Sequence, residues 1–154
     1  MKVILPGSYD PITLGHLDVI RRASDVYSEV YVVAFINPEK KYMFSEDERK
    51  RMLSLATEDI PGVTVDFSDG RVVDYMKLHG IERIVKGYRN QKDFEYEKIQ
   101  AEYNRIHGGF ETELLEASSE LGEISSTLAR EAMLSGKSLE GILPAKVIQY
   151  INER

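Results

Sequence analysis

Several short segments of the chain combine residue types that bind phosphate groups. The first, residues 7–16, contains two glycines and ends in Gly15-His16, where a helix is expected to begin. Free backbone N–H groups at a helix start favour an anion, and a histidine there can donate a hydrogen bond to a phosphoryl oxygen. A Pro/Gly turn with Thr13 as the helix cap explains the same residues equally well. This segment alone therefore leaves both interpretations open.

Three further segments add cations and hydroxyl groups. Lys40 and Lys41 lie in a turn, where they are either solvated or reach over a site. Residues 86–89, Lys-Gly-Tyr-Arg, follow an apolar run, and we expect Gly87 to form a tight turn there. The two flanking cations can bind phosphate or pair with Glu95 and Glu97. Residues 125–127, Ser-Ser-Thr, combine hydroxyl and N–H donors at a helix start, although capping needs only one of them.

The elements that must position these segments alternate along the chain. Apolar, β-branched runs predict strands near residues 3–5, 30–35, 63–65, 81–85 and 112–115. Helical patterns cover residues 17–26, 45–57, 72–78, 91–107, 126–134 and 144–151. The first two runs are apolar throughout, which is typical of strands covered on both faces.

This order predicts one domain over residues 1–154, with a Rossmann-like, doubly wound α/β fold. Its five-stranded parallel sheet should carry helices on both faces. Ligands of such sheets bind beyond the carboxyl ends of the strands. We therefore expect the four segments with phosphate-binding residue types, residues 7–16, 40–41, 86–89 and 125–127, to meet there; they are called the phosphate-type segments or loops below.

Composition narrows the choice of partners. The 154 residues include no cysteine, and 20 Lys+Arg stand against 26 Asp+Glu, a formal net charge of −6. Thiol chemistry and cysteine-bound metals are excluded. The acidic balance argues against nucleic acid and membrane surfaces, but not against a small anionic ligand held by a local basic cluster. The first apolar run ends at Pro6-Gly7, so we expect no signal peptide and a cytoplasmic location.

Taken together, the motifs resemble the nucleotidyltransferase superfamily with the (H/T)-x-G-H signature, here Thr13-Leu14-Gly15-His16. More narrowly, they resemble the bacterial pantetheine-phosphate adenylyltransferases. The resemblance covers nearly the whole chain, in family order and spacing. It is carried by residues 6–16, 40–41, 86–89, 93–97 and 124–127.

The resemblance implies an activity. Members of the family transfer AMP from ATP to 4′-phosphopantetheine, which gives dephospho-coenzyme A and pyrophosphate in the penultimate step of coenzyme A biosynthesis. They use Mg²⁺, form homohexamers and proceed without a covalent intermediate. Coenzyme A is a possible feedback ligand.

It also implies roles for individual residues. The catalytic residues would be His16, Lys40 and Arg89. The ATP-binding residues would be Ser8, Tyr9, His16, Gly87, Tyr88, Arg89, Glu97, Ser125, Ser126 and Thr127. The acceptor would be bound by Ser8, Lys40, Val72 and Lys86. No side chain is implied as a metal ligand.

Two departures from the family keep alternatives open. Arg71 follows Gly70 where relatives carry an apolar pair, and Leu121-Gly122-Glu123 replace aromatic residues before the hydroxyl run. Both favour a sibling nucleotidyltransferase with another acceptor, such as nicotinamide mononucleotide. A non-catalytic nucleotide-binding protein is a third interpretation. It would not need to keep His16, the residue aimed at the α-phosphate.

Overall fold

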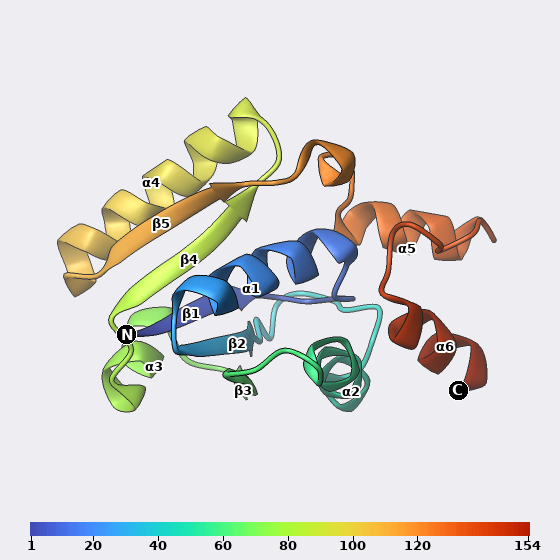
Figure 1. The fold of residues 1–154 in the computed structure, drawn as a ribbon, viewed down its shortest axis with the longest axis horizontal. Helices are drawn as coiled ribbons and strands as arrows, with labels where there is room; N and C mark the ends of the chain where they lie inside the picture. The colour runs from blue at the N-terminus through green and yellow to red at the C-terminus, as the bar shows by residue number, and fades with distance from the viewer.

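Five parallel strands in the order β3-β2-β1-β4-β5 form the sheet at the centre of the molecule (Figure 1). The computed structural model describes residues 1–118 and 120–154 with their side chains. The strands are β1 (Lys2–Gly7), β2 (Glu29–Phe35), β3 (Val63–Ser68), β4 (Arg83–Tyr88) and β5 (Glu111–Glu116). The predicted fold class and strand count are confirmed.

Helices cover both faces of the sheet. One face carries α1 (Leu14–Val26), α2 (Glu46–Thr57), α5 (Ser126–Leu134) and α6 (Ala145–Glu153). The other carries α3 (Val72–His79) and α4 (Gln91–Gly108), which touch where Val73 approaches Gly108. A short 3₁₀ helix, η1 (Ser119–Leu121), was not expected from the sequence.

The central strand shows why the sequence folds in this way. Val3 and Leu5 of β1 belong to the core under α1, whereas Ile4 belongs to the core under α3. All three side chains are buried. Because successive side chains of a strand point to opposite faces, an uninterrupted apolar run needs a cover on both sides.

Strands β1 and β4 separate early, and this separation opens the sheet. Strand β1 pairs with β2 along its whole length, from Lys2 to Gly7. With β4, only Val3 and Ile4 find partners, Arg83 and Ile84. The strand order also reverses between β1 and β4, which is where open α/β sheets bind ligands. Among the described residues, no helix is long and apolar enough to cross a membrane.

Candidate active site

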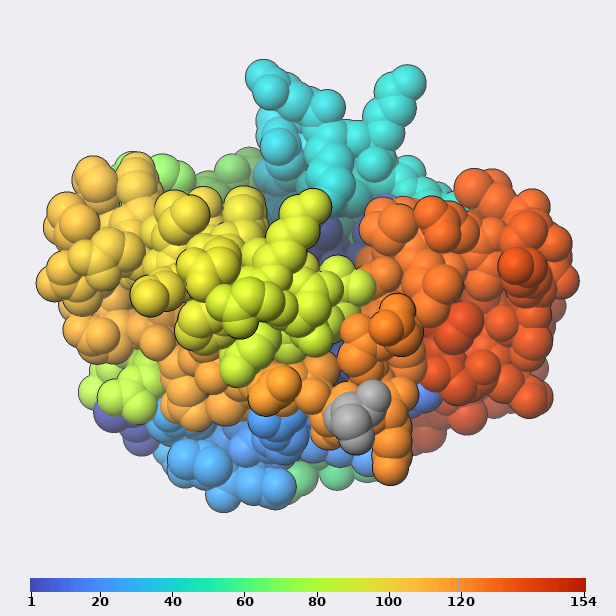
Figure 2. All heavy atoms as spheres, turned by 90° about the horizontal axis from the view of Figure 1, so that it is seen from above, coloured from blue at the N-terminus to red at the C-terminus, as the bar shows by residue number. Residues whose placement is uncertain are grey.

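A cleft of about 450 Å³ lies above the gap between β1 and β4. Figure 2 shows it as a hollow between the yellow-green segment around residues 86–97 and the orange segment around residues 125–130. Every residue predicted to bind ATP or to act in catalysis lines this cleft. They are Ser8, Tyr9, His16, Lys40, Gly87, Tyr88, Arg89, Glu97, Ser125, Ser126 and Thr127.

A second hollow of about 450 Å³ adjoins the first. The two share the last residues of β1 and Ser8, which follows that strand, and they also share residues of β4 and α4, including Lys86 and Glu97. Val72, which sequence reasoning assigned to the acceptor, lines the second hollow and not the cleft. The predicted acceptor residues are therefore divided between the cleft and its neighbour, and Ser8 and Lys86 lie where the two meet.

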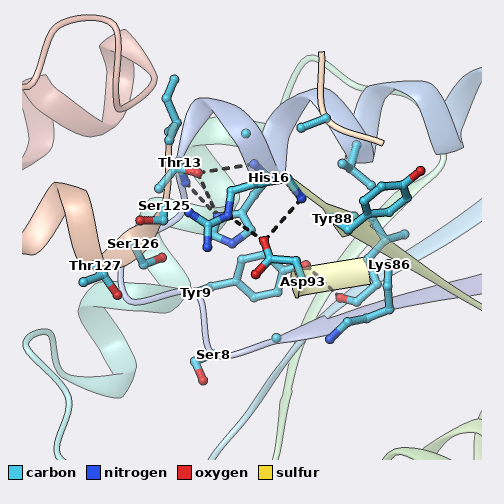
Figure 3. A pocket seen from close by; sticks show the side chains of 18 of the residues that line it. Ser8, Tyr9, Thr13, His16, Lys86, Tyr88, Asp93, Ser125, Ser126 and Thr127 are labelled. Atoms are coloured by element: carbon cyan, nitrogen blue, oxygen red, sulfur yellow. Dashed lines mark hydrogen bonds and ion pairs between the residues drawn. The ribbon is translucent and has the colours of Figure 1, made fainter. Parts of the chain in front are cut away.

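His16 is held in one orientation by the start of its own helix (Figure 3). Thr13 is the N-cap of α1, and its Oγ1 accepts a hydrogen bond from the His16 N–H at 3.3 Å. In return, the Thr13 N–H donates to His16 Nδ1 at 3.0 Å. This is a capping box in which histidine takes the place usually held by glutamate or glutamine. It explains why threonine and histidine stand three residues apart in the motif.

The same hydrogen bond determines which ring nitrogen carries the proton. A backbone N–H can only donate, so His16 Nδ1 accepts and Nε2 bears the hydrogen. Burial, reinforced by the charges of Lys86 and Arg89, lowers the pKa of His16 to about 4. The imidazole is therefore neutral near pH 7, and Nε2 can donate to an anionic ligand.

We expect the His16 ring of the free protein to titrate near pH 4 in NMR spectra, and not near its ordinary pKa of 6.5. Because the unfolded chain binds this proton at a higher pH than the folded chain, the free energy of unfolding should decrease as the pH falls from 6.5 to about 4. A His16→Gln variant should lose this part of the pH dependence. A His16 titration midpoint near 6.5 would contradict the expectation.

The loop before α1 is tied to α5 and to the loop after β2. Ser126 Oγ donates to the Pro11 carbonyl at 2.8 Å, and Arg130 Nη1 donates to the Asp10 carbonyl at 2.8 Å. The buried Asp10 carboxylate accepts from the backbone N–H groups of Met43 and Phe44, at 2.8 and 2.9 Å. The phosphate-type loops are thus held together by their own polar groups.

These contacts distinguish the three hydroxyls of the Ser-Ser-Thr run. Ser125 Oγ accepts from the Leu128 N–H at 3.1 Å and Thr127 Oγ1 accepts from Arg130 at 3.2 Å, so both O–H groups remain available to donate. The Ser126 O–H already donates to Pro11. Phosphate oxygens only accept, so Ser125 and Thr127 are the better side-chain donors to a nucleotide.

The cations of the cleft differ in their partners. Lys86 Nζ lies 3.5 Å from Glu97 Oε2, and Arg89 Nε lies 3.0 Å from Asp93 Oδ2. Pairing with α4 was one of the two interpretations of this segment, but Glu95 takes no such part: it accepts from Gln91 at 2.6 Å. The other lysine in the cleft, Lys40, donates to Ser8 Oγ at 3.2 Å.

Gly87 and Gly15, two glycines that line the cleft, differ in the space that the structure leaves for a side chain. Gly87 lies within β4 and not in a tight turn, so that expectation was wrong. A Cβ there would come within 2.8 Å of Val19 Cγ2, because α1 packs closely on the strand. At Gly15 a Cβ would meet Ile124 O and Thr13 Oγ1 only at 3.5 Å, an ordinary contact.

This contrast gives a prediction for two matched variants. Gly87→Ala should lower the melting temperature, by the ~1–3 kcal/mol typical of an overpacked core. Gly15→Ala should leave the melting temperature nearly unchanged but weaken ATP binding, because Gly15 lines the cleft and a methyl group there adds bulk to its wall. Thermal unfolding and ATP titration of both variants check this. A Gly15→Ala protein that binds ATP like the wild type would contradict the second half.

Leu121 of the second departure lines the cleft, but the charged residue of each departure from the family pattern lies outside it. Glu123 is exposed and is not among the lining residues. Arg71 lines the second hollow, where its Nε pairs with Asp74 at 3.1 Å and the side chain remains exposed. Neither residue therefore brings its charge into the cleft with His16.

The parallel sheet and the phosphate-type loops over the β1–β4 gap together indicate a class of protein. Comparison with known proteins supports that class. Residues 4–132 match the family described as cytidylyltransferase-like. A provisionally named nicotinate-nucleotide adenylyltransferase from Vibrio parahaemolyticus has a similar structure, with a TM-score of 0.70 over 99% of this chain and 92% of that one. Its sequence is only 17% identical, so the likeness shows the fold alone.

Sequence relatives narrow the class. Phosphopantetheine adenylyltransferases of Symbiobacterium thermophilum and Cutibacterium acnes are each 41% identical over 100% of this chain, covering 96% and 98% of their own lengths. That of Clostridium novyi is 41% identical over 96% of this chain and 92% of its own. The chain belongs to the cytidylyltransferase-like family and, within it, to the phosphopantetheine adenylyltransferases.

Proposed function

We propose that this protein transfers the adenylyl group of ATP to the phosphate of 4′-phosphopantetheine, releasing pyrophosphate and forming dephospho-coenzyme A. The observation that supports it best is the meeting of the two hollows at Ser8 and Lys86. A nucleotide in the cleft and a pantetheine arm in the second hollow would bring their phosphates together there. Family membership points to the same reaction.

The chemistry needs positioning and charge more than a nucleophile on the protein. A phosphate oxygen of the acceptor attacks the α-phosphorus of ATP, and the bond from that phosphorus to the bridging oxygen breaks as pyrophosphate leaves. The Nε2–H of His16 would donate to the α-phosphoryl oxygen as negative charge grows on it. Lys40 and Lys86 would hold the acceptor phosphate, and Arg89 the nucleotide.

Magnesium fits this proposal as part of the nucleotide substrate. Within residues 1–118 and 120–154, no three histidine, aspartate or glutamate side chains gather where they could hold a metal ion. Mg²⁺ is usually bound by water, substrate phosphates and one or two carboxylates, and not by a cage made of protein alone. We therefore propose that ATP brings the ion with it.

Helix α4 supports a proposed assembly. Its side chains Tyr96, Ile99, Tyr103 and Ile106 recur at intervals of three and four residues, and each is more than half exposed. An apolar stripe of this kind suits a contact with another copy of the chain. We propose the family's homohexamer, with coenzyme A as a feedback ligand whose pantetheine arm would enter the second hollow, and a cytoplasmic location.

The proposal is tested by pyrophosphate release from MgATP with 4′-phosphopantetheine and, in parallel, with nicotinamide mononucleotide. We expect release with the first acceptor only. Release with nicotinamide mononucleotide alone would favour the sibling enzyme. ATP binding without release in either reaction would favour a non-catalytic nucleotide-binding protein.

A further inference from the structure

Arg49 is a buried cation that the proposed reaction does not yet use. It lies on α2, its residue is only 2% exposed, and it lines neither hollow. Across the part of the chain described with side chains, no carboxylate oxygen lies within 4.0 Å of its guanidinium. Its Nε has no hydrogen-bond partner. A buried charge without a counter-charge is destabilising, so its presence needs a reason.

The contacts that Arg49 does make lead to Ser8. The guanidinium lies over the ring of Tyr42 at 4.0 Å and near that of Phe67 at 5.5 Å. Its Nη1 donates to the Ser8 carbonyl at 3.1 Å. Lys40 reaches the same residue from the cleft, since its Nζ donates to Ser8 Oγ at 3.2 Å and lies 5.5 Å from the Tyr42 ring centroid. Two cations thus hold Ser8, one by its side chain and one by its backbone.

The ion pairs around the cleft are therefore unevenly distributed. On the β4 side, Lys86 and Arg89 each face a carboxylate of α4. On the Ser8 side, no ion pair within the described residues involves Lys40 or Arg49. An anion at Ser8 would offset both charges, and its attraction to the buried Arg49 is screened less by solvent than its attraction to the exposed Lys40.

We infer that Arg49 is a positioning residue for the acceptor phosphate. Its buried charge acts through Ser8 and gives the acceptor site its selectivity for a phosphorylated ligand. The inference rests on the proposed function, because it takes the phosphate at Ser8 to be that of 4′-phosphopantetheine.

Calorimetric titrations with 4′-phosphopantetheine and with pantetheine, which lacks the phosphate, test the inference. In the wild type the phosphorylated ligand should bind more tightly. Arg49→Gln keeps a donor for Ser8 but removes the charge. The ratio of the dissociation constant for pantetheine to that for 4′-phosphopantetheine should therefore shrink by about tenfold. The dissociation constant for ATP should stay within about twofold of the wild-type value. Arg49→Lys keeps the charge and should retain the ratio within about threefold.

Arg51→Gln, an exposed position on the same helix, is the matched control and should behave like the wild type. If Arg49→Gln does not fold, Arg49→Met, which fills the space beside the two rings, takes its place. The inference would be overturned if Arg49→Gln or Arg49→Met kept the wild-type ratio of the two dissociation constants, or if it lost the same affinity for both ligands. The proposed function would still stand in either case. A wild-type protein that binds neither ligand would overturn both.

Discussion

Replacing His16 with alanine should lower turnover by about a hundredfold to a thousandfold, the usual effect of removing one preorganised donor to a developing charge. ATP affinity should change only a few-fold, because the cations and helix-start N–H groups that we propose to hold the ground-state phosphates remain. The effect is large because the neutral ring is fixed by Thr13 and its Nε2–H is already oriented before the substrates arrive.

Initial rates of pyrophosphate release and calorimetric ATP titration measure the two quantities separately. His79→Ala is a suitable control, since that histidine lies at the end of α3 and lines neither hollow. Turnover of His16→Ala near the wild-type value would remove His16 from the reaction. A loss of ATP affinity as large as the loss of turnover would make it a binding residue instead.

Asp10→Ala should be the most damaging single change to stability among the loops of the site. It leaves the N–H groups of Met43 and Phe44 without their buried acceptor. At roughly 1–3 kcal/mol for each unsatisfied donor, we expect a loss of about 3 kcal/mol and a melting temperature lower by roughly 10 °C. Turnover should fall as well, because the segment that carries Lys40 is released from the first loop.

Thermal unfolding followed by circular dichroism, together with turnover at a temperature where both proteins are folded, checks this prediction. Asp25→Ala, an exposed aspartate on α1, should change the free energy of unfolding by no more than about 0.5 kcal/mol. If Asp10→Ala had the same melting temperature as Asp25→Ala, the Asp10 carboxylate would not be the group that holds the two loops together.

Much of the fold could be predicted because each element carries its own local signal. The unbroken apolar runs of β1 and β2 required covers on both faces, and the helical pattern over residues 45–57 corresponds to α2. The phosphate-type loops were found for a related reason. They follow strands or open helices, and in a parallel sheet those ends must lie along one edge.

What could not be predicted depends on contacts between distant segments. The partners of Asp10 are backbone groups more than thirty residues away, and neither they nor the burial of Arg49 leaves a local pattern. The early separation of β1 from β4 is likewise invisible in either strand alone. Gly87 was assigned to a turn because glycine is frequent in turns. In the structure, glycine is needed there because Val19 of α1 leaves no room for a Cβ.

The capping box of α1 makes helix formation and the orientation of the His16 ring inseparable. The hydrogen bonds that close the first turn of the helix are the ones that choose the tautomer of His16. Helix ends open locally at lower free energy than whole domains. On warming, the fraction of molecules with a correctly poised imidazole should therefore decline before the helical signal does, so that enzymatic activity reports on the fraying of a single helical turn.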